Sequence, residues 1–353
     1  SQQYGYFMET TPRQVALEKT RKLTKFSDVV TCWNLTSFVF KNMLSTHVVG
    51  EKGEWCDYPL FPEIFRKAGY NVTFITNEFL PQAKEAVYDF SGGFFLNNPE
   101  LSKLQFDHRN TQLHDLDDGL LQDYDDSLKQ YRTEHNLTIF HLMGQHVSYN
   151  FRYRANQAKF WASSYEDKRP ELSTKQRKVL SYYDNATLYN DSIVAQIVNR
   201  FRNENAIVIY VPDHGEECYE ENRGFICRNH SAQIDWPLAH YEFEIPFWIY
   251  CSQKYIRTHR DIYRQIRAAK DKRYMTDALP HLLLYLAGIE TPTYREEYNI
   301  LSPKYNEMRP RILKNSADYD KLRDEHIAKE KAKEEAKEAQ TKKNKKKKGN
   351  KKK

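Results

Sequence analysis

A short apolar run in the middle of the chain ends abruptly in Asp-His-Gly. Residues 208–211, Val-Ile-Tyr-Val, are followed by Pro212, Asp213, His214 and Gly215. A short, β-branched run that stops at a glycine favours a buried parallel strand over a helix. Sites in open α/β sheets form beyond the carboxyl ends of strands, and a carboxylate beside an imidazole suits zinc. We therefore predict that Asp213 and His214 bind a metal; the alternative is a capped turn after a core strand.

Two other strand-like runs also end in polar residues. One leads through His141 to a glycine and then His146, and another ends in Asn77 and Glu78. A fourth strand-like run, residues 246–252, ends without a residue that we assign to catalysis or metal binding. Because strand ends at one edge of a sheet form a composite site, we expect these polar groups to share one cavity. On the residues alone, His141 is also explained as a buried core histidine, whereas His146, beyond the glycine, is predicted to be functional.

With these segments in place, the chain resembles the phosphoethanolamine transferases of bacterial envelopes, within the alkaline phosphatase/sulfatase superfamily. The matching segments follow the family's order and are TCWNLTSFVFKNMLS (31–45), HLMGQHVSYNFRYRANQAKF (141–160), YDNATLYNDSIV (183–194), DHGEE (213–217) and EIPFWIY (244–250). The resemblance extends from about residue 4 to residue 310. It implies an α/β fold with a mostly parallel central sheet flanked by helices, in a catalytic domain of residues 1–315.

The resemblance implies a nucleophile and a zinc site. Thr36, four residues after Cys32, stands where the family places its nucleophile. The zinc ligands implied in this way are Thr36, Asp213, His214 and His230. The spacing to His230 is longer here than in the family, so His240 is the competing ligand.

The resemblance also implies the residues around the substrate. His146 matches a histidine that contacts the phosphoryl group or a second metal, and it would act as general acid or steady the transferring group. Asn77, Glu78 and His141 are assigned to substrate binding.

The implied reaction is transfer of phosphoethanolamine from phosphatidylethanolamine to a lipopolysaccharide acceptor, either lipid A or core. A threonine hydroxyl is almost never ionised at pH 7, and zinc on its oxygen would lower its pKa sharply. Thr36 would then attack the lipid donor and form a phosphoethanolamine–Thr36 intermediate. From the residues alone, Thr36 also fits an ordinary helix start, where hydroxyls cap free amides.

One departure from the family concerns the start of the chain. The family's remaining zinc ligand is a glutamate in a Gly-Glu pair on the first strand, just upstream of a segment like YGYFMETTPR (4–13). The chain begins at Ser1, so we expect a truncated product that lacks this ligand, that strand and the family's membrane helices. The resemblance places the native protein in the bacterial inner membrane, with its catalytic domain facing the periplasm.

Other functions remain open at this stage. Within the same superfamily, the alternatives are a phosphoglycerol transferase, a phosphodiesterase or a sulfatase. A different class is a non-catalytic module that binds the bacterial envelope, because the expected loss of the Gly-Glu strand would also fit a decayed metal site.

The last segment, residues 316–353, is predicted to be a charged, lysine-rich tail. Residues 321–340 fit a solvated helix of mixed charge. Residues 341–353 hold nine lysines and no acidic residue, so the formal charge of +6 falls to −3 without them. Attraction to an anionic lipid or lipopolysaccharide surface is one role for such a tail, and a disordered solubilising end is the alternative. Nucleic acid is not an expected partner.

The cysteines argue against a thiolate zinc site. The chain has five cysteines and no close Cys-x-x-Cys pair. Cys218 and Cys227 flank the Asp-His-Gly loop and are candidates for a disulfide bond, and an odd count leaves one cysteine unpaired within the chain.

Overall fold

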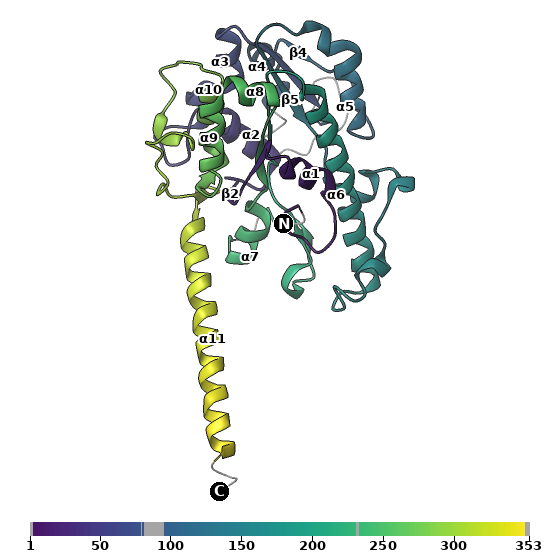
Figure 1. Cartoon of the computed structure of the whole chain (residues 1–353), viewed down its shortest axis with the longest axis vertical. Helices are drawn as coiled ribbons and strands as arrows, with labels where there is room; N and C mark the ends of the chain where they lie inside the picture. Colours follow the sequence, from purple (N-terminus) through teal and green to yellow (C-terminus); the bar gives the residue numbers. More distant parts are fainter. Residues whose placement is uncertain (1–2, 79, 81–94, 231–232, 350–353) are drawn as a thin grey trace.

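The computed structural model describes residues 3–78, 80, 95–230 and 233–349, with strand β9 (Phe247–Cys251) at its core (Figure 1). All five residues of β9 are buried, and successive side chains enter different clusters. Phe247, Ile249 and Cys251 pack with residues of the helices on one side, and Trp248 and Tyr250 pack with those on the other. This alternation with a period of two residues is what a strand between two helical layers requires.

Two three-stranded sheets form the central layer. The first has the order β1-β9-β6 with antiparallel pairs, and the second has the order β4-β3-β5 with parallel pairs. Their other strands are β1 (Leu23–Phe26), β3 (Asn71–Thr76), β4 (His108–Arg109), β5 (Asn136–His141) and β6 (Ile207–Tyr210).

The strand predicted at residues 208–211 is therefore present as β6, but its neighbour among the described strands, β9, runs antiparallel to it. The expectation of a parallel partner is wrong for this pair. An uninterrupted apolar run reports that a strand is covered on both faces, and it carries no information on the direction of the neighbouring strand.

Helices cover both faces of the central layer. Residues of α2, α3, α9 and α10 enter the clusters on one face, and residues of α1, α5 and α6 enter those on the other. The bounds are α1 (Pro12–Lys19), α2 (Thr36–Leu44), α3 (Phe61–Lys67), α4 (Pro99–Gln105), α5 (Asp118–Asp123), α6 (Thr174–Phe201), α7 (Trp236–Leu238), α8 (Gln253–Thr258), α9 (Arg260–Ala268), α10 (Leu279–Leu286) and α11 (Tyr319–Gly349). In Figure 1, α11 projects away from the rest of the molecule. Within the described residues, no helix combines the length and the apolar character needed to cross a membrane.

Strands β5 and β6 border one cavity of about 1580 Å³. Within the described residues each has a single paired neighbour, and both are only half-buried along their length. Consecutive residues of each strand line the cavity, so it is bordered by strand edges rather than by one face. Such edges present unpaired backbone groups that a further strand can pair with.

Three two-stranded pairs complete the described strands. They are β2 (Asp28–Val30) with β10 (Arg273–Met275), β7 (Glu217–Cys218) with β8 (Ile226–Cys227), and β11 (Ile312–Leu313) with β12 (Ala317–Asp318). In the β7–β8 ribbon, Cys218 pairs with Ile226 and Glu217 pairs with Cys227. Because neighbouring residues of a strand point to opposite faces, Cys218 and Cys227 face apart. The predicted bridge between them is therefore wrong, and all five cysteines are free.

A buried carboxylate ties α1 to α6. Asp191 of α6 is fully buried, and its two oxygens accept hydrogen bonds from the backbone N–H groups of Arg13 and Gln14, both at 2.9 Å. These amides lie in the first turn of α1, where no intrahelical acceptor exists. The side chain of Gln14 in turn accepts a 2.8 Å hydrogen bond from Nε1 of Trp248. The N-terminal segment is thereby fastened to the central strand.

We expect Asp191→Ala to destabilise the fold by about 2 to 4 kcal/mol, because it leaves the buried amide of Gln14 and the part-buried amide of Arg13 without acceptors. Unfolding in urea would measure the loss. Gln196→Ala, an exposed position on the same helix, should cost less than about 0.5 kcal/mol. Equal stability of the two variants would show that Asp191 does not hold α1.

Candidate active site

Thr36 and Asp213 meet where α2 begins and the segment after β6 follows. Oγ1 of Thr36 donates a 2.7 Å hydrogen bond to Oδ2 of Asp213. Thr36 is the first residue of α2, and no side-chain cap hydrogen bond is made at this helix start. The hydroxyl is thus directed to the site, in contrast to the capping role that the sequence also allowed.

His214 forms a compact group with Asp213. Its backbone N–H donates to Oδ1 of Asp213 at 3.0 Å, and its Nε2 lies 3.1 Å from Oδ2. Burial by itself raises the pKa of Asp213, but the charge of His214 and hydrogen bonds from His214 and Thr36 lower this pKa well below its usual range. Asp213 is therefore ionised at neutral pH, with three potential donor atoms close together: its own Oδ2, Oγ1 of Thr36 and Nε2 of His214.

A half-buried cation that the sequence analysis missed lies against this group. Nη1 of Arg228 contacts Nε2 of His214. Burial opposes its positive charge, but the charges of Glu216 and Asp213 outweigh burial and raise its pKa. The guanidinium is a permanent cation between two carboxylates. Its one signal in the sequence is its position two residues before His230.

The histidines predicted around the substrate line the same cavity as Asp213. Nδ1 of His141 lies 3.0 Å from Oγ1 of Thr76. Burial lowers the pKa of His141 to about 4, and burial with the charges of Arg228 and Arg152 lowers the pKa of His146 to about 4. Both imidazoles are therefore neutral at pH 7. Nδ1 of His146 is buried and has no hydrogen-bond partner, so it can still bind a group that enters the cavity.

Glu78 faces the same cavity from the end of β3. Its Oε2 lies 3.7 Å from Nε2 of His141. Burial and the charge of Asp213 raise the pKa of Glu78 to about 8. Glu78 is therefore mostly protonated at pH 7, whereas Asp213 is ionised, and a cation placed between the two groups would favour the ionised form of Glu78.

Asn77 is directed away from the cavity, into the wall that supports it. Its Nδ2 donates to Oδ1 of Asp117 at 3.0 Å, and its Oδ1 accepts from the backbone N–H of His114 at 2.7 Å. Asp117 also accepts from the backbone N–H groups of Met143 and Gly144, both at 2.9 Å. In this structure Asn77 therefore acts on the site through the turn that leads to His146.

The two candidates for the later histidine have different surroundings. Nδ1 of His230 is buried and has no hydrogen-bond partner, and burial with the charges of Arg228 and His214 lowers its pKa to about 4. Nδ1 of His240 lies 2.8 Å from Oε1 of Glu244, which leaves Nε2 as the ring nitrogen open to a metal. Because the charge of His214 acts on His230, His230 lies near the Asp213–His214 group, and we favour it over His240. Across the described ranges, no three His, Cys, Asp or Glu side chains are gathered so as to hold a metal ion.

One buried glutamate, also missed by the sequence analysis, holds the segments of the site together. Oε2 of Glu242 accepts a 2.6 Å hydrogen bond from Nδ2 of Asn34, and Oε1 accepts one of 2.9 Å from the backbone N–H of Asn229. Its backbone carbonyl accepts from the N–H of Gly215 at 2.8 Å. The approach is so close that a Cβ at Gly215 would lie 2.4 Å from the carbonyl oxygen of Tyr241. Glu242 thus joins the segments that carry Thr36, His214 and His230.

A known family matches most of the chain. A sequence profile of the Sulfatase family matches residues 1–289. The chain belongs to the sulfatase family.

Relatives of this sulfatase-family chain are similar over most of its length. Phosphoethanolamine transferase EptC of Escherichia coli (strain K12) is 29% identical over 308 residues, which are 86% of this chain and 51% of the relative. Phosphoethanolamine transferase CptA of Salmonella typhimurium is 29% identical over 309 residues, again 86% of this chain and 51% of the relative. The chain spans about half the length of the curated relatives it matches.

Solved structures agree with the sequence relatives. The C-terminal periplasmic domain of EptC from Escherichia coli has a TM-score of 0.74 and 28% identity, and the match covers 90% of this chain and 88% of that one. A complex of the same domain with zinc also has a TM-score of 0.74 and 28% identity, over 91% and 89% of the two chains. The predicted α/β fold of the alkaline phosphatase/sulfatase type is confirmed.

We expect Glu242→Ala to destabilise the protein by about 2 to 4 kcal/mol, because it leaves buried donors without acceptors. It should also speed hydrogen exchange at the amide of Asn229, whose acceptor is the Glu242 side chain. The matched control is Glu217→Ala, which removes another fully buried glutamate, paired with Arg223. That control should leave exchange at the Asn229 amide unchanged, and unchanged exchange in the Glu242 variant would refute the joining role.

Proposed function

We propose that the chain is the catalytic domain of a zinc-dependent transferase that moves phosphoethanolamine from phosphatidylethanolamine to lipid A or core lipopolysaccharide. The proposed intermediate is phosphoethanolamine–Thr36. The hydrogen bond from Thr36 to Asp213, in a sulfatase-family chain whose relatives are phosphoethanolamine transferases, carries this proposal. The likeness to a periplasmic domain supports a location at the bacterial inner membrane, facing the periplasm.

The residues present fit zinc. Oδ2 of Asp213 lies 2.7 Å from Oγ1 of Thr36 and 3.1 Å from Nε2 of His214, so oxygen and nitrogen donors already converge. The unpartnered Nδ1 of His230 offers a further donor. When bound, zinc would lower the pKa of the Thr36 hydroxyl and neutralise charge on the phosphoryl group.

The chemistry of the side chains supports a two-step transfer. In the first step, Oγ of Thr36 bonds to the phosphorus of the donor while the bond to the diacylglycerol oxygen breaks, and that oxygen takes up a proton. In the second step, an oxygen of the acceptor bonds to the phosphorus and Thr36 leaves. Thr36 begins α2, and a helix N-terminus favours the negative charge of a phosphoryl group.

His146 and Arg228 are proposed to hold the transferring group. The pKa of His146 is lowered by burial and by nearby cations, and an anionic phosphodiester beside it would raise this pKa again. His146 can then donate a hydrogen bond or a proton toward the leaving oxygen. Arg228 supplies a fixed positive charge on the same side, where it counters the charge that develops on the phosphoryl oxygens.

Replacing Thr36 tests the nucleophile. Thr36→Ala should abolish transfer and leave the fold intact, because the variant lacks the attacking oxygen, whereas Thr36→Ser keeps a hydroxyl and should retain measurable transfer. Mass spectrometry of the Thr36 peptide, after incubation with phosphatidylethanolamine and no acceptor, should show a phosphoethanolamine adduct. An unmodified peptide from folded, zinc-loaded protein would overturn the proposed intermediate.

Zinc titration tests the ligand set and separates the two histidines. Asp213→Ala, His214→Ala and His230→Ala should each weaken zinc binding by more than the roughly 10–100-fold lost when a group behind a ligand is removed. His240→Ala should leave zinc affinity unchanged, because the proposed ligands are Thr36, Asp213, His214 and His230. Calorimetry on each variant measures this. Full zinc affinity in both the Asp213 and His214 variants would contradict the site.

A further inference from the structure

Helix α11 (Tyr319–Gly349) has two parts. The first part, residues 319–326, packs against the domain and is called the root. The second part, residues 327–349, projects away from the domain and is called the shaft (Figure 1). Leu322 and His326 in the first two turns of α11 are partly buried, whereas residues 327–342 are all exposed. The shaft is rich in Ala, Glu and Lys, a composition that forms semi-rigid helical spacers. Ion pairs such as Glu330 with Lys333, at 2.7 Å, lie along it. Residues 327–340, which precede the lysine-rich end, extend about 21 Å at 1.5 Å per residue.

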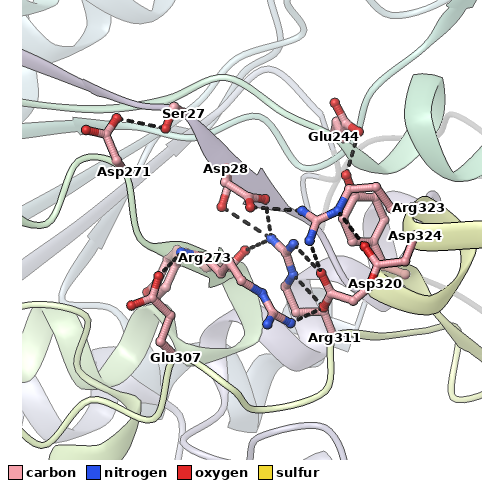
Figure 2. Close-up of polar contacts among 12 residues, drawn as sticks. Ser27, Asp28, Glu244, Asp271, Arg273, Glu307, Arg311, Asp320, Arg323 and Asp324 are labelled. Atoms are coloured by element: carbon pink, nitrogen blue, oxygen red, sulfur yellow. Dashed lines mark hydrogen bonds and ion pairs between the residues drawn. The ribbon is translucent and has the colours of Figure 1, made fainter. Parts of the chain in front are cut away.

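The root is held by a cluster of ion pairs that includes Asp28 of β2 and Arg273 of β10. Figure 2 shows the guanidinium groups of Arg311 and Arg323 converging on the carboxylates of Asp28 and Asp320. Arg311 is 2% exposed, and its side chain donates to Oδ1 of Asp28 at 2.5 Å and to Oδ1 of Asp320 at 2.7 Å. Removing one partner from a buried cluster of this kind leaves an uncompensated charge, so the cluster resists separation.

Contacts of Tyr319 and His326 with the domain fix the direction of the shaft. Tyr319 is buried, and its hydroxyl donates to Oε1 of Glu244 at 2.5 Å. The ring of His326 stacks on Trp236 of α7, with ring centroids 5.1 Å apart. In Figure 1, α11 leaves the domain on the side of α7. Tyr319 and Arg323 line the same cavity as Asp213, so the shaft leaves from the side of the molecule that carries the candidate active site.

The end of the shaft has the chemistry of a non-specific anion binder. Residues 341–353 hold nine lysines, with no arginine, no aromatic residue and no acidic residue. Lysines are point charges that suit a diffuse anionic surface, whereas arginines and aromatic rings serve phosphate forks and bases in nucleic acid. The rest of the chain carries a formal charge of −3. An anionic bilayer attracts this positively charged end and repels the negatively charged remainder of the chain. A spacer between the two keeps the remainder away from the bilayer.

We propose that α11 is a fixed spacer whose lysine-rich end, residues 341–353, binds an anionic phospholipid bilayer and holds the catalytic domain about 21 Å from the surface, with the site on the facing side. Each lysine near such a surface strengthens binding by about fivefold. The inference goes beyond the proposed transfer reaction, and it concerns a surface that takes no part in the chemistry.

Vesicle binding tests the lysine-rich end without any turnover. The full chain should sediment with phosphatidylcholine vesicles that contain phosphatidylglycerol, but not with phosphatidylcholine alone, and salt should weaken this binding. Changing all nine lysines of residues 341–353 to glutamine should abolish the binding, whereas changing them to arginine should preserve it. These vesicles contain no phosphatidylethanolamine, so a failed transfer reaction would not affect the result.

Two outcomes would overturn the proposed partner. The first is binding to vesicles that survives the change to glutamine. The second is tighter binding to duplex DNA than to the anionic vesicles at the same salt, which would assign the end to nucleic acid.

Energy transfer tests the spacer. A donor dye on the exposed Cys56 and acceptor dyes in the vesicle should report one narrow range of distances for the full chain. Ala336→Pro breaks the shaft and leaves every lysine in place, so vesicle binding should persist while the range broadens. The matched control Ala336→Ser keeps the helix and should behave as the full chain does. The same distance range in the proline variant would overturn the spacer.

Discussion

The burial of β9 between two helical layers is the constraint on which the other parts depend. Side chains of β9 enter clusters on both faces, and Trp248 also binds Gln14 of α1. A strand covered in this way cannot slip by one residue, because every apolar side chain would change faces. Its register therefore sets the position of β6, which ends at the loop that carries Asp213.

Charge is the second organising element of the site. The carboxylate of Asp213 and the carboxyl group of Glu78 face one cavity, and the permanent charge of Arg228 acts on Asp213. Burial strengthens these interactions, because the low dielectric of the interior screens them weakly. Burial also leaves the imidazoles of His141 and His146 neutral at pH 7. Of these groups, Arg228 alone lies outside the three strand-end motifs.

Helix α11 illustrates how a polar helix is oriented without a core of its own. Its exposed shaft gains only small increments from pairs of charged residues. The direction comes from the root, where Arg311, Asp28 and Asp320 are joined and Tyr319 is buried. Glu244, which accepts a hydrogen bond from Tyr319, lines the same cavity as Asp213, so the proposed spacer begins beside the candidate site.

Local sequence patterns predicted the positions of the main strands. The runs that became β3, β5, β6 and β9 were predicted to within a few residues, because strands buried on both faces leave uninterrupted apolar stretches. Motif order was enough to bring Thr36, Asp213 and His214 to one place. Tertiary structure alone decided the antiparallel direction of β9, the separation of Cys218 from Cys227, and the buried roles of Glu242 and Arg228. Each of these features depends on residues that are distant in the chain. A single buried charged residue belongs to no local sequence pattern from which its partner could be predicted.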